Sequence, residues 1–242
     1  MTLLSANLID SILPHYEFSA EQARFNMIEQ QIRPWGVLDP KVLDLLRHVK
    51  RELFVPQHLQ ALAFTDTQLP LGQGQFMLSP KLEARLLQAA NPSASERVLE
   101  VGTGSGYMAA LLGFAAAQVV TFEAVHSLIT PAHHALKQAL LDNVNVEQGC
   151  GFQGAIEQAG ERGWDLIVLS GSVPSLNSLS QDFLNTLSIK GRLITVVGDV
   201  NHSPMMQAMR VTRNSETVFI NETLFECDAP ALNGVFSTKF VF

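Results

Sequence analysis

The sequence predicts an α/β fold in which helices cover both faces of a doubly wound, mostly parallel sheet of seven strands. From residue 97 to residue 197, short apolar segments alternate with amphipathic, helix-like segments, which is typical of repeated βαβ units. After residue 198 the segments are extended and lack helices of comparable length, which indicates a closing antiparallel pair. Apolar residues make up 47% of the 242 residues, so the chain can bury a full core.

A helical and loop section, residues 1–95, precedes the α/β core, residues 96–242, and we expect the two to form one compact unit. The helices of the first section are predicted from apolar periodicity and from an acid or serine followed by proline, which is a helix-start signal. They are 21–32, a helix that begins at Asp39-Pro40, and a helix that begins at Ser79-Pro80. The stretch 54–78 has prolines and glycines but weak periodicity, so we expect loop with short extended pieces.

In the core, strands and helices alternate regularly. The predicted strands are 97–101, 118–123, 144–148, 165–170 and 192–197. The predicted helices are 106–116, 125–142, 152–160 and 176–187. The extended segments that follow are 205–211, 217–225 and 235–242.

A glycine-rich turn joins the first core strand to the first core helix. Its glycines, Gly102, Gly104 and Gly106, follow a G-x-G-x-G spacing, and Tyr107 stands where a dinucleotide fingerprint has its third glycine. Glycines let the backbone turn tightly and let a ligand lie against bare main chain. A strand, a glycine turn and a helix place that ligand at the carboxyl edge of the sheet. The turn therefore predicts a nucleotide-type site.

Two acidic residues indicate which nucleotide. Glu100 lies two residues before the first glycine, where a negative charge repels a pyrophosphate and suits a cation. S-adenosylmethionine (AdoMet) carries a sulfonium and an ammonium and has no phosphate, so it is favoured over NAD, the cofactor of an alternative oxidoreductase. Glu123 ends the next strand, where a carboxylate can accept hydrogen bonds from both ribose hydroxyls. The candidate cofactor-binding residues here are Glu100, Gly102, Thr103, Gly104, Ser105, Gly106 and Glu123.

Charge and composition narrow the partners. The net charge is −7 and no Lys/Arg run stands out, so no nucleic-acid partner is expected. No apolar run approaches the ~20 residues that span a bilayer, and no signal peptide is visible, so we expect a cytoplasmic protein without a membrane partner. The two cysteines make no disulfide framework. His133 and His134 are adjacent in a predicted helix and face different directions, so no metal site is expected.

Four blocks between residues 24 and 200 match the pattern of a known enzyme family. They are 26–32 with 36–39 and 42–43; 51–56 with 63–66 and 69–75; 98–107 with 109–112; and 164–168 with 187, 190–193 and 196–198. On these blocks the chain resembles the protein-L-isoaspartate O-methyltransferase family, as a divergent member. The third block alone indicates only an AdoMet-dependent methyltransferase. The second is the specific one, because it holds the run Leu-Pro-x-Gly-x-Gly-Gln at 69–75.

The resemblance implies a Rossmann-like AdoMet methyltransferase fold and an enzyme that methylates the carboxylate of L-isoaspartyl residues, with D-aspartyl residues as a further candidate acceptor. Its partners would be damaged proteins or peptides, and the methyl ester starts their repair. We expect a monomer or a weak homodimer. A carboxylate is already ionised at neutral pH, so the transfer needs no general base. The site must instead hold the acceptor oxygen in line with the methyl group.

The acceptor loop departs from the family pattern. The family has Gly-Gln-Thr-Ile-Ser-Gln-Pro, whereas residues 74–80 read Gly-Gln-Phe-Met-Leu-Ser-Pro. The family's active-site hydroxyl therefore falls on Leu78, which offers no hydrogen bond. Ser79, one residue along, is a candidate catalytic residue if a local shift lets it substitute; as an alternative it caps the helix that Pro80 begins. The candidate substrate-binding residues are Gln75, Phe76, Met77, Leu78 and Ser170.

Two further departures concern the cofactor and the function. Cys150 stands between two glycines where the family usually has an Asp that accepts from the adenine amino group, and a thiol is a poor acceptor. We keep Cys150 and Gly151 as candidate cofactor-binding residues, with main-chain groups as an alternative. Ser170, at the end of the fourth core strand, either contacts substrate or simply forms a turn.

The alternatives in function are a methyltransferase for another carboxylate and an AdoMet-binding sensor or partner protein.

Overall fold

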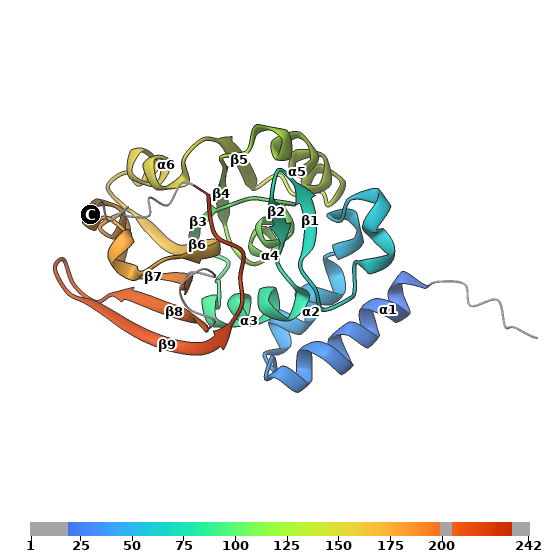
Figure 1. Ribbon diagram of the computed structural model, residues 1–242. Helices are drawn as coiled ribbons and strands as arrows, with labels where there is room; N and C mark the ends of the chain where they lie inside the picture. Colours follow the sequence, from blue (N-terminus) through green and yellow to red (C-terminus); the bar gives the residue numbers. More distant parts are fainter. Residues whose placement is uncertain (1–18, 199–204, 234–242) are drawn as a thin grey trace, which may run out of the picture.

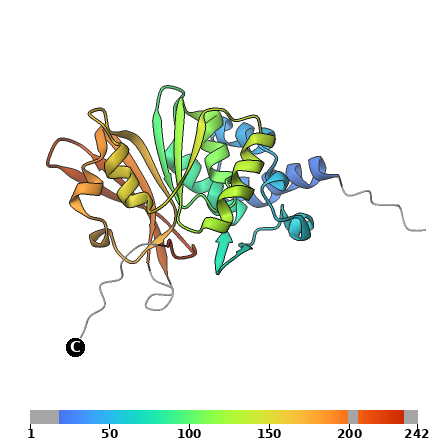
Figure 2. The ribbon, with the colours of Figure 1, turned by 90° about the horizontal axis from the view of Figure 1, so that it is seen from above.

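The computed structural model describes residues 19–198 and 205–233, and it confirms the predicted fold (Figures 1 and 2). One seven-stranded sheet has the order β5-β4-β3-β6-β7-β8-β9. The first five strands in this order are parallel, and β8 and β9 add to them antiparallel, as the extended segments after residue 198 predict. The strands are β3 (Arg97–Val101), β4 (Gln118–Glu123), β5 (Val144–Gln148), β6 (Trp164–Val173), β7 (Leu187–Val197), β8 (Met206–Arg213) and β9 (Phe219–Cys227).

Helices lie on both faces of this sheet, which is why the central strands β3, β4 and β6 are mostly apolar and buried (Figure 2). Successive strand residues serve opposite faces: Val98 packs in one hydrophobic cluster and Leu99 in the other. The first cluster holds α3 (Pro80–Ala90), α4 (Tyr107–Ala115) and the inner side of α5 (His126–Gln138). The second holds α6 (Gly151–Gln158) and α7 (Gln181–Leu184).

The N-terminal section packs on the α3 and α4 side of the sheet (Figure 1). The predicted helix 21–32 is divided into α1 (Ala20–Asn26) and a π-helical turn, Met27–Ile32, whose apolar residues are buried. The helix that begins at Asp39-Pro40 is α2 (Pro40–His48), and the Asp39 side chain accepts a hydrogen bond from the Lys41 N–H. The 54–78 stretch contains 3₁₀ turns and a hairpin of β1 (Leu69–Gly72) and β2 (Gln75–Met77).

One predicted helix is wrong. Residues 176–187 form only a 3₁₀ turn, Leu176–Ser178, and the four-residue α7. The strands on either side are longer than predicted, because β6 continues to Val173 and β7 begins at Leu187, which pairs with Trp164. The backbone is extended at Leu179 and Ser180, and the Ser180 hydroxyl accepts from the Phe183 N–H, so α7 begins there and one long helix does not form. The extended segment predicted at 235–242 lies outside the described residues.

A buried ion pair attaches the N-terminal section to α3. Arg51 is fully buried and pairs through Nη1 with Glu83. Its Nε donates to the Ala63 carbonyl at 2.9 Å, and its Nη2 donates to the Leu78 carbonyl at 2.7 Å. Arg51 thus fixes the backbone where β2 passes into α3.

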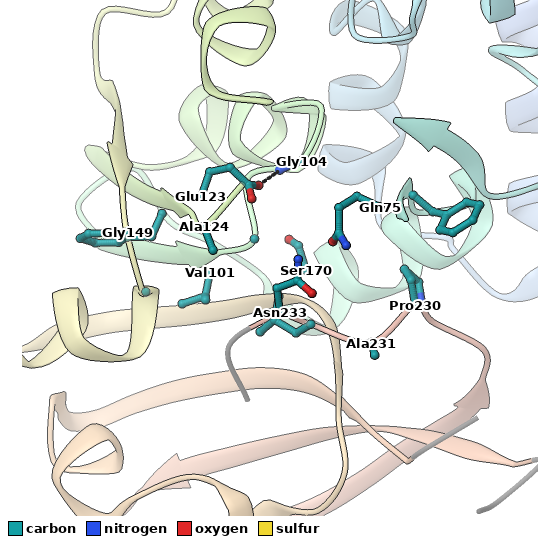
Figure 3. Close-up of a pocket in the computed structure, with 15 residues that line it drawn as sticks. Gln75, Val101, Gly104, Glu123, Ala124, Gly149, Ser170, Pro230, Ala231 and Asn233 are labelled. Atoms are coloured by element: carbon teal, nitrogen blue, oxygen red, sulfur yellow. Dashed lines mark hydrogen bonds between the residues drawn. The ribbon is translucent and has the colours of Figure 1, made fainter. Parts of the chain in front are cut away.

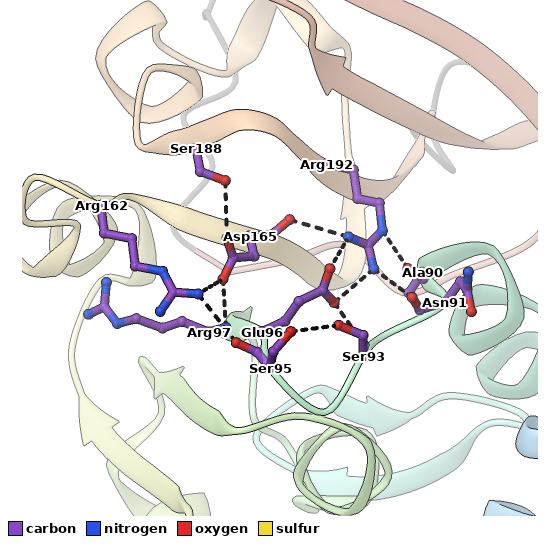
Figure 4. Close-up of polar contacts among 10 residues, drawn as sticks. All are labelled: Ala90, Asn91, Ser93, Ser95, Glu96, Arg97, Arg162, Asp165, Ser188 and Arg192. Carbon is purple, nitrogen blue, oxygen red and sulfur yellow. Dashed lines mark hydrogen bonds and ion pairs between the residues drawn. The ribbon is translucent and has the colours of Figure 1, made fainter.

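A second polar network lies at the amino end of the sheet (Figure 4). Arg192 of β7 contacts both carboxylate oxygens of Glu96, at 2.8 and 3.0 Å. The same guanidinium donates to the carbonyls of Ala90 and Asn91, at 2.6 and 2.7 Å, where α3 ends. The network therefore holds the last turn of α3 against the start of β3.

No helix in the described part of the chain is long and apolar enough to cross a membrane.

Replacing Arg192 with Met should lower the free energy of unfolding by about 2 kcal/mol, because a half-buried carboxylate and two helix-end carbonyls lose their donor. Urea unfolding followed by circular dichroism measures this loss. Arg210→Met is the matched control, since Arg210 pairs with the exposed Glu222 and an exposed pair contributes less than about 1 kcal/mol. Equal losses in the two variants would contradict the role given to the network.

Candidate functional site

A pocket lies at the carboxyl ends of β3, β4 and β6, where the glycine turn predicts a ligand (Figure 3). It encloses about 490 Å³ including its open mouth. Strand β3 has β4 on one side and β6 on the other, so the order in which the strands are added reverses here. This is the switch point at which open α/β sheets bind ligands. Its lining residues are Gln75, Phe76, Val101, Gly102, Gly104, Phe122, Glu123, Ala124, Gly149, Gly151, Ser170, Pro230, Ala231, Leu232 and Asn233.

The glycines of the turn adopt backbone angles that L side chains rarely adopt. Gly102 and Gly104 have φ of +95° and +52°, and both line the pocket. A Cβ on Gly102 would lie 2.7 Å from the Leu232 side chain, so the pocket wall there must be bare main chain. Gly106, with φ of +85°, starts α4 and packs against Ala132 of α5. The structure thus places Gly106 behind the pocket, as a support for the turn.

Glu100 is fully buried beneath the turn. Its carboxyl group accepts hydrogen bonds from the hydroxyls of Thr121 and Ser170, both at 2.6 Å. Burial raises the pKa of Glu100 to about 8; the two hydrogen bonds lower it, and the nearby carboxylates of Glu123 and Glu83 raise it. The sequence predicts an acidic group at the mouth of the turn, and the structure buries this carboxyl group beneath the turn. A cation bound beside it would lower this pKa and ionise it.

Glu123 is fixed at the end of β4. One carboxylate oxygen accepts from the Gly104 N–H and the other from the Val125 N–H, both at 2.8 Å. The side chain is therefore held in one orientation, and each oxygen keeps capacity for a further hydrogen bond. Because Glu123 also lines the pocket, that capacity is available to a ligand.

A smaller recess adjoins this pocket and shares Phe76, Gly102, Gly104 and Ser170 with it. Strand β2 carries Phe76 and Met77 into the recess, and Leu78 follows directly after the strand. Phe76 is 43% exposed and lies between the two spaces, whereas Leu78 is buried. The recess is further lined by Glu83, Glu100, Thr103, Ser105 and Met108. The structure thus brings the candidates Gln75, Phe76, Met77 and Leu78 together with Ser170 around the pocket and the recess.

Two predicted site residues lie elsewhere. Ser79 stands at the N-terminus of α3, but its side chain makes no capping hydrogen bond, and it lines a different pocket beside Trp35 and Asp66. Cys150 is exposed at the start of α6, and its neighbours Gly149 and Gly151 line the pocket at the carboxyl ends of β3, β4 and β6 instead. Main-chain groups therefore form this wall.

The sequence did not predict two components of the site. Glu83 interrupts the apolar face of α3, and that charge among leucines is the signal that could have revealed it. The segment Pro230–Asn233 forms part of the pocket wall because it pairs with the end of β6. Ser172 N donates to the Pro230 carbonyl at 2.8 Å, and Leu232 N donates to the Ser172 carbonyl at 2.9 Å. This contact depends on how β9 returns to the sheet, which no local pattern shows.

Comparison with known proteins identifies a family that matches most of this chain. Residues 22–227 match the model of the family Protein-L-isoaspartate(D-aspartate) O-methyltransferase (PCMT). Protein-L-isoaspartate O-methyltransferase 1 of Rhodopseudomonas palustris is 38% identical over 198 residues, which cover 82% of this chain and 77% of that protein. The protein of the same name from Geotalea uraniireducens is 34% identical over 210 residues, covering 87% and 92%.

The fold is also shared with solved structures. A Plasmodium falciparum protein, named as a beta-aspartate methyltransferase (PCMT) in complex with S-adenosyl-L-homocysteine, superposes with a TM-score of 0.73. The two are 19% identical, and the match covers 89% of this chain and 99% of that one. A family match over most of the sequence, joined to a glycine-turn pocket at the switch point, establishes that this chain belongs to the protein-L-isoaspartate(D-aspartate) O-methyltransferase family.

Proposed function

We propose that this protein is an AdoMet-dependent O-methyltransferase that methylates the carboxylate of L-isoaspartyl residues, and of D-aspartyl residues, in damaged proteins and peptides. The observation that carries the proposal is the match of residues 22–227 to this family together with the buried Glu100 under the glycine turn. The match covers the hairpin β1–β2 and α3 as well as the sheet, so both the cofactor side and the acceptor side belong to it.

The pocket residues fit AdoMet. Glu123 is oriented to accept from ribose hydroxyls, and the bare main chain at Gly102 and Gly104 allows close approach. Glu100 can supply a negative charge beneath a bound cation. When bound, AdoMet supplies a methyl group on a sulfonium, which passes to the acceptor oxygen as the carbon–sulfur bond breaks.

The acceptor side of the site only has to position the substrate carboxylate. The substrate carboxylate is already ionised, so no proton is transferred, and the products are a methyl ester and a neutral thioether. The recess offers an apolar wall, Phe76 and Leu78, and polar groups at its rim, Gln75 and Ser170. We infer that Gln75 holds the acceptor and that the apolar wall excludes water from it.

The departure at Leu78 favours a second candidate function. A buried leucine in place of the family's hydroxyl removes a hydrogen-bond donor from the recess. A different carboxylate could then be the preferred acceptor, or the protein could bind AdoMet as a sensor. These alternatives share the cofactor site and differ in the acceptor.

Radiolabelled methyl transfer to an isoaspartyl peptide and to its normal aspartyl twin tests the proposal. We expect a base-labile label on the isoaspartyl peptide only, because an ester is formed. AdoMet binding measured by calorimetry is the control for an intact cofactor site. Tight AdoMet binding without label on either peptide would reject isoaspartyl transfer in favour of the second candidate.

Glu100→Gln should weaken AdoMet binding about tenfold and stabilise the protein above neutral pH. The folded-state pKa of about 8 lies above the ordinary 4.5, so the folded state keeps a proton that the unfolded state loses. Stability contributed by this group is therefore lost as pH rises from about 4.5 to about 8. The variant cannot ionise, so its Tm should exceed that of the wild type by a few degrees at pH 8 and less at pH 6. Calorimetric titration and thermal unfolding at both pH values measure the two effects.

Leu78→Ser should raise kcat for the isoaspartyl peptide about fivefold, because one restored neutral donor contributes about 1 kcal/mol. Leu78→Val is the control, since it changes size and adds no donor. Initial rates at saturating AdoMet give both values.

Ser79→Ala tests whether a local shift brings Ser79 into the recess. A tenfold lower kcat would show that it does, whereas the position of Ser79 in the other pocket predicts an unchanged kcat.

A further inference from the structure

A separate pocket of about 1090 Å³, its open mouth included, lies between the first turns of α3, the end of β9 and Trp35. It shares no lining residue with the cofactor pocket or with the acceptor recess. Its walls are Trp35, Ser79 and Arg85 on one side, and residues 225–228 on the other. We call it the Arg85 pocket. Nothing in the transfer of a methyl group requires this space.

Most charged groups of the Arg85 pocket already have a partner. Asp66 contacts the Lys81 ammonium at 2.8 Å, and this ammonium lies 4.1 Å from the centroid of the Trp35 ring. Asp228 accepts from the Gln68 amide at 3.3 Å. Glu226 is exposed on the edge strand β9 and also lines the pocket.

Arg85 is different. Its guanidinium lies 3.7 Å from the centroid of the Phe225 ring, and it makes no ion pair or hydrogen bond with any residue in 19–198 or 205–233. Burial lowers the pKa of this half-buried group, which means that desolvation costs the cation free energy that an anion would offset. The Ser79 hydroxyl, on the same wall, is also without a hydrogen-bond partner among these residues. The available donors of the pocket therefore suit a carboxylate.

We propose that the Arg85 pocket binds the carboxylate of an acidic side chain on the protein substrate, three or four residues from the isoaspartyl residue. The inference rests on the proposed function. The spacing follows from the chain itself: Phe76 lines the transfer site and Ser79, three residues along, lines the Arg85 pocket, so the Cα atoms of these two residues lie at most about 10 Å apart. Three or four residues of an extended substrate cover that distance. A planar guanidinium stacked on an aromatic ring is pre-oriented for a two-point contact with a carboxylate.

Steady-state kinetics with matched isoaspartyl peptides tests this. The peptides carry either Glu or Gln at the third and fourth positions on each side of the isoaspartyl residue. We expect the Glu peptide to have a KM about fivefold lower than the Gln peptide, with kcat unchanged, because the contact is remote from the reacting atoms. Arg85→Gln should abolish the difference, and Arg85→Lys should keep part of it. Arg210→Gln, at a paired surface arginine, should leave the difference intact.

Tryptophan fluorescence gives a readout that does not need catalysis. Of the two tryptophans, Trp35 is 56% exposed in the pocket and Trp164 is fully buried, so a change on peptide binding reports Trp35. We expect the Glu peptide to change the emission at a lower concentration than the Gln peptide. Equal KM and equal titration curves would overturn the inference. So would an equal response to free glutarate, because the pocket would then bind small carboxylates independently of a peptide.

The two proposals fail differently. If no isoaspartyl peptide is methylated, the proposed function is rejected, and the fluorescence titration still decides whether the pocket prefers the Glu peptide. If both peptides are methylated with the same KM and Arg85→Gln has no effect, the proposed function stands and the pocket has no role in substrate choice.

Discussion

The buried ion pair of Arg51 and Glu83 is the constraint on which the acceptor side depends. Taking both charges out of water is costly, and the cost is offset only because Arg51 also donates to the carbonyls of Ala63 and Leu78. Burial raises the pKa of Glu83 to about 7, although Arg51 lowers it. These contacts fix the backbone between β2 and α3, so the recess and the Arg85 pocket keep their separation.

The cofactor side follows a related principle, in which a buried acid is held by neutral donors. Glu100 has two hydroxyl partners and no cation among the described residues, so its ionisation is left to a bound ligand. Glu123, in contrast, is held by backbone N–H groups and is fixed before any ligand arrives. One acid thus has a raised pKa that a bound cation would lower, while the other is held in a single orientation.

Local patterns predicted most elements of the fold, and their failures have physical causes. The alternation from residue 97 onward predicted five parallel strands because their two buried faces require continuous apolar segments. The helix at 176–187 was wrong because the backbone is extended at Leu179 and Ser180, where buried Leu179 and Phe183 pack into the second hydrophobic cluster. The helix at 21–32 changes to π-helical geometry after Asn26, where buried Met27, Ile28 and Ile32 meet the N-terminal core. In both places packing overrides local propensity.

The sequence by itself determined the glycine turn, its acids Glu100 and Glu123, and the family, because the conformation of a tight turn and the spacing of its charges are written in consecutive residues. Only the tertiary structure decided the rest of the site. It buried Glu100 and raised its pKa, placed Ser79 in the Arg85 pocket, and brought Pro230–Asn233 and Glu83 to the site. These outcomes depend on contacts between residues far apart in the chain, and such contacts leave no local periodicity to read.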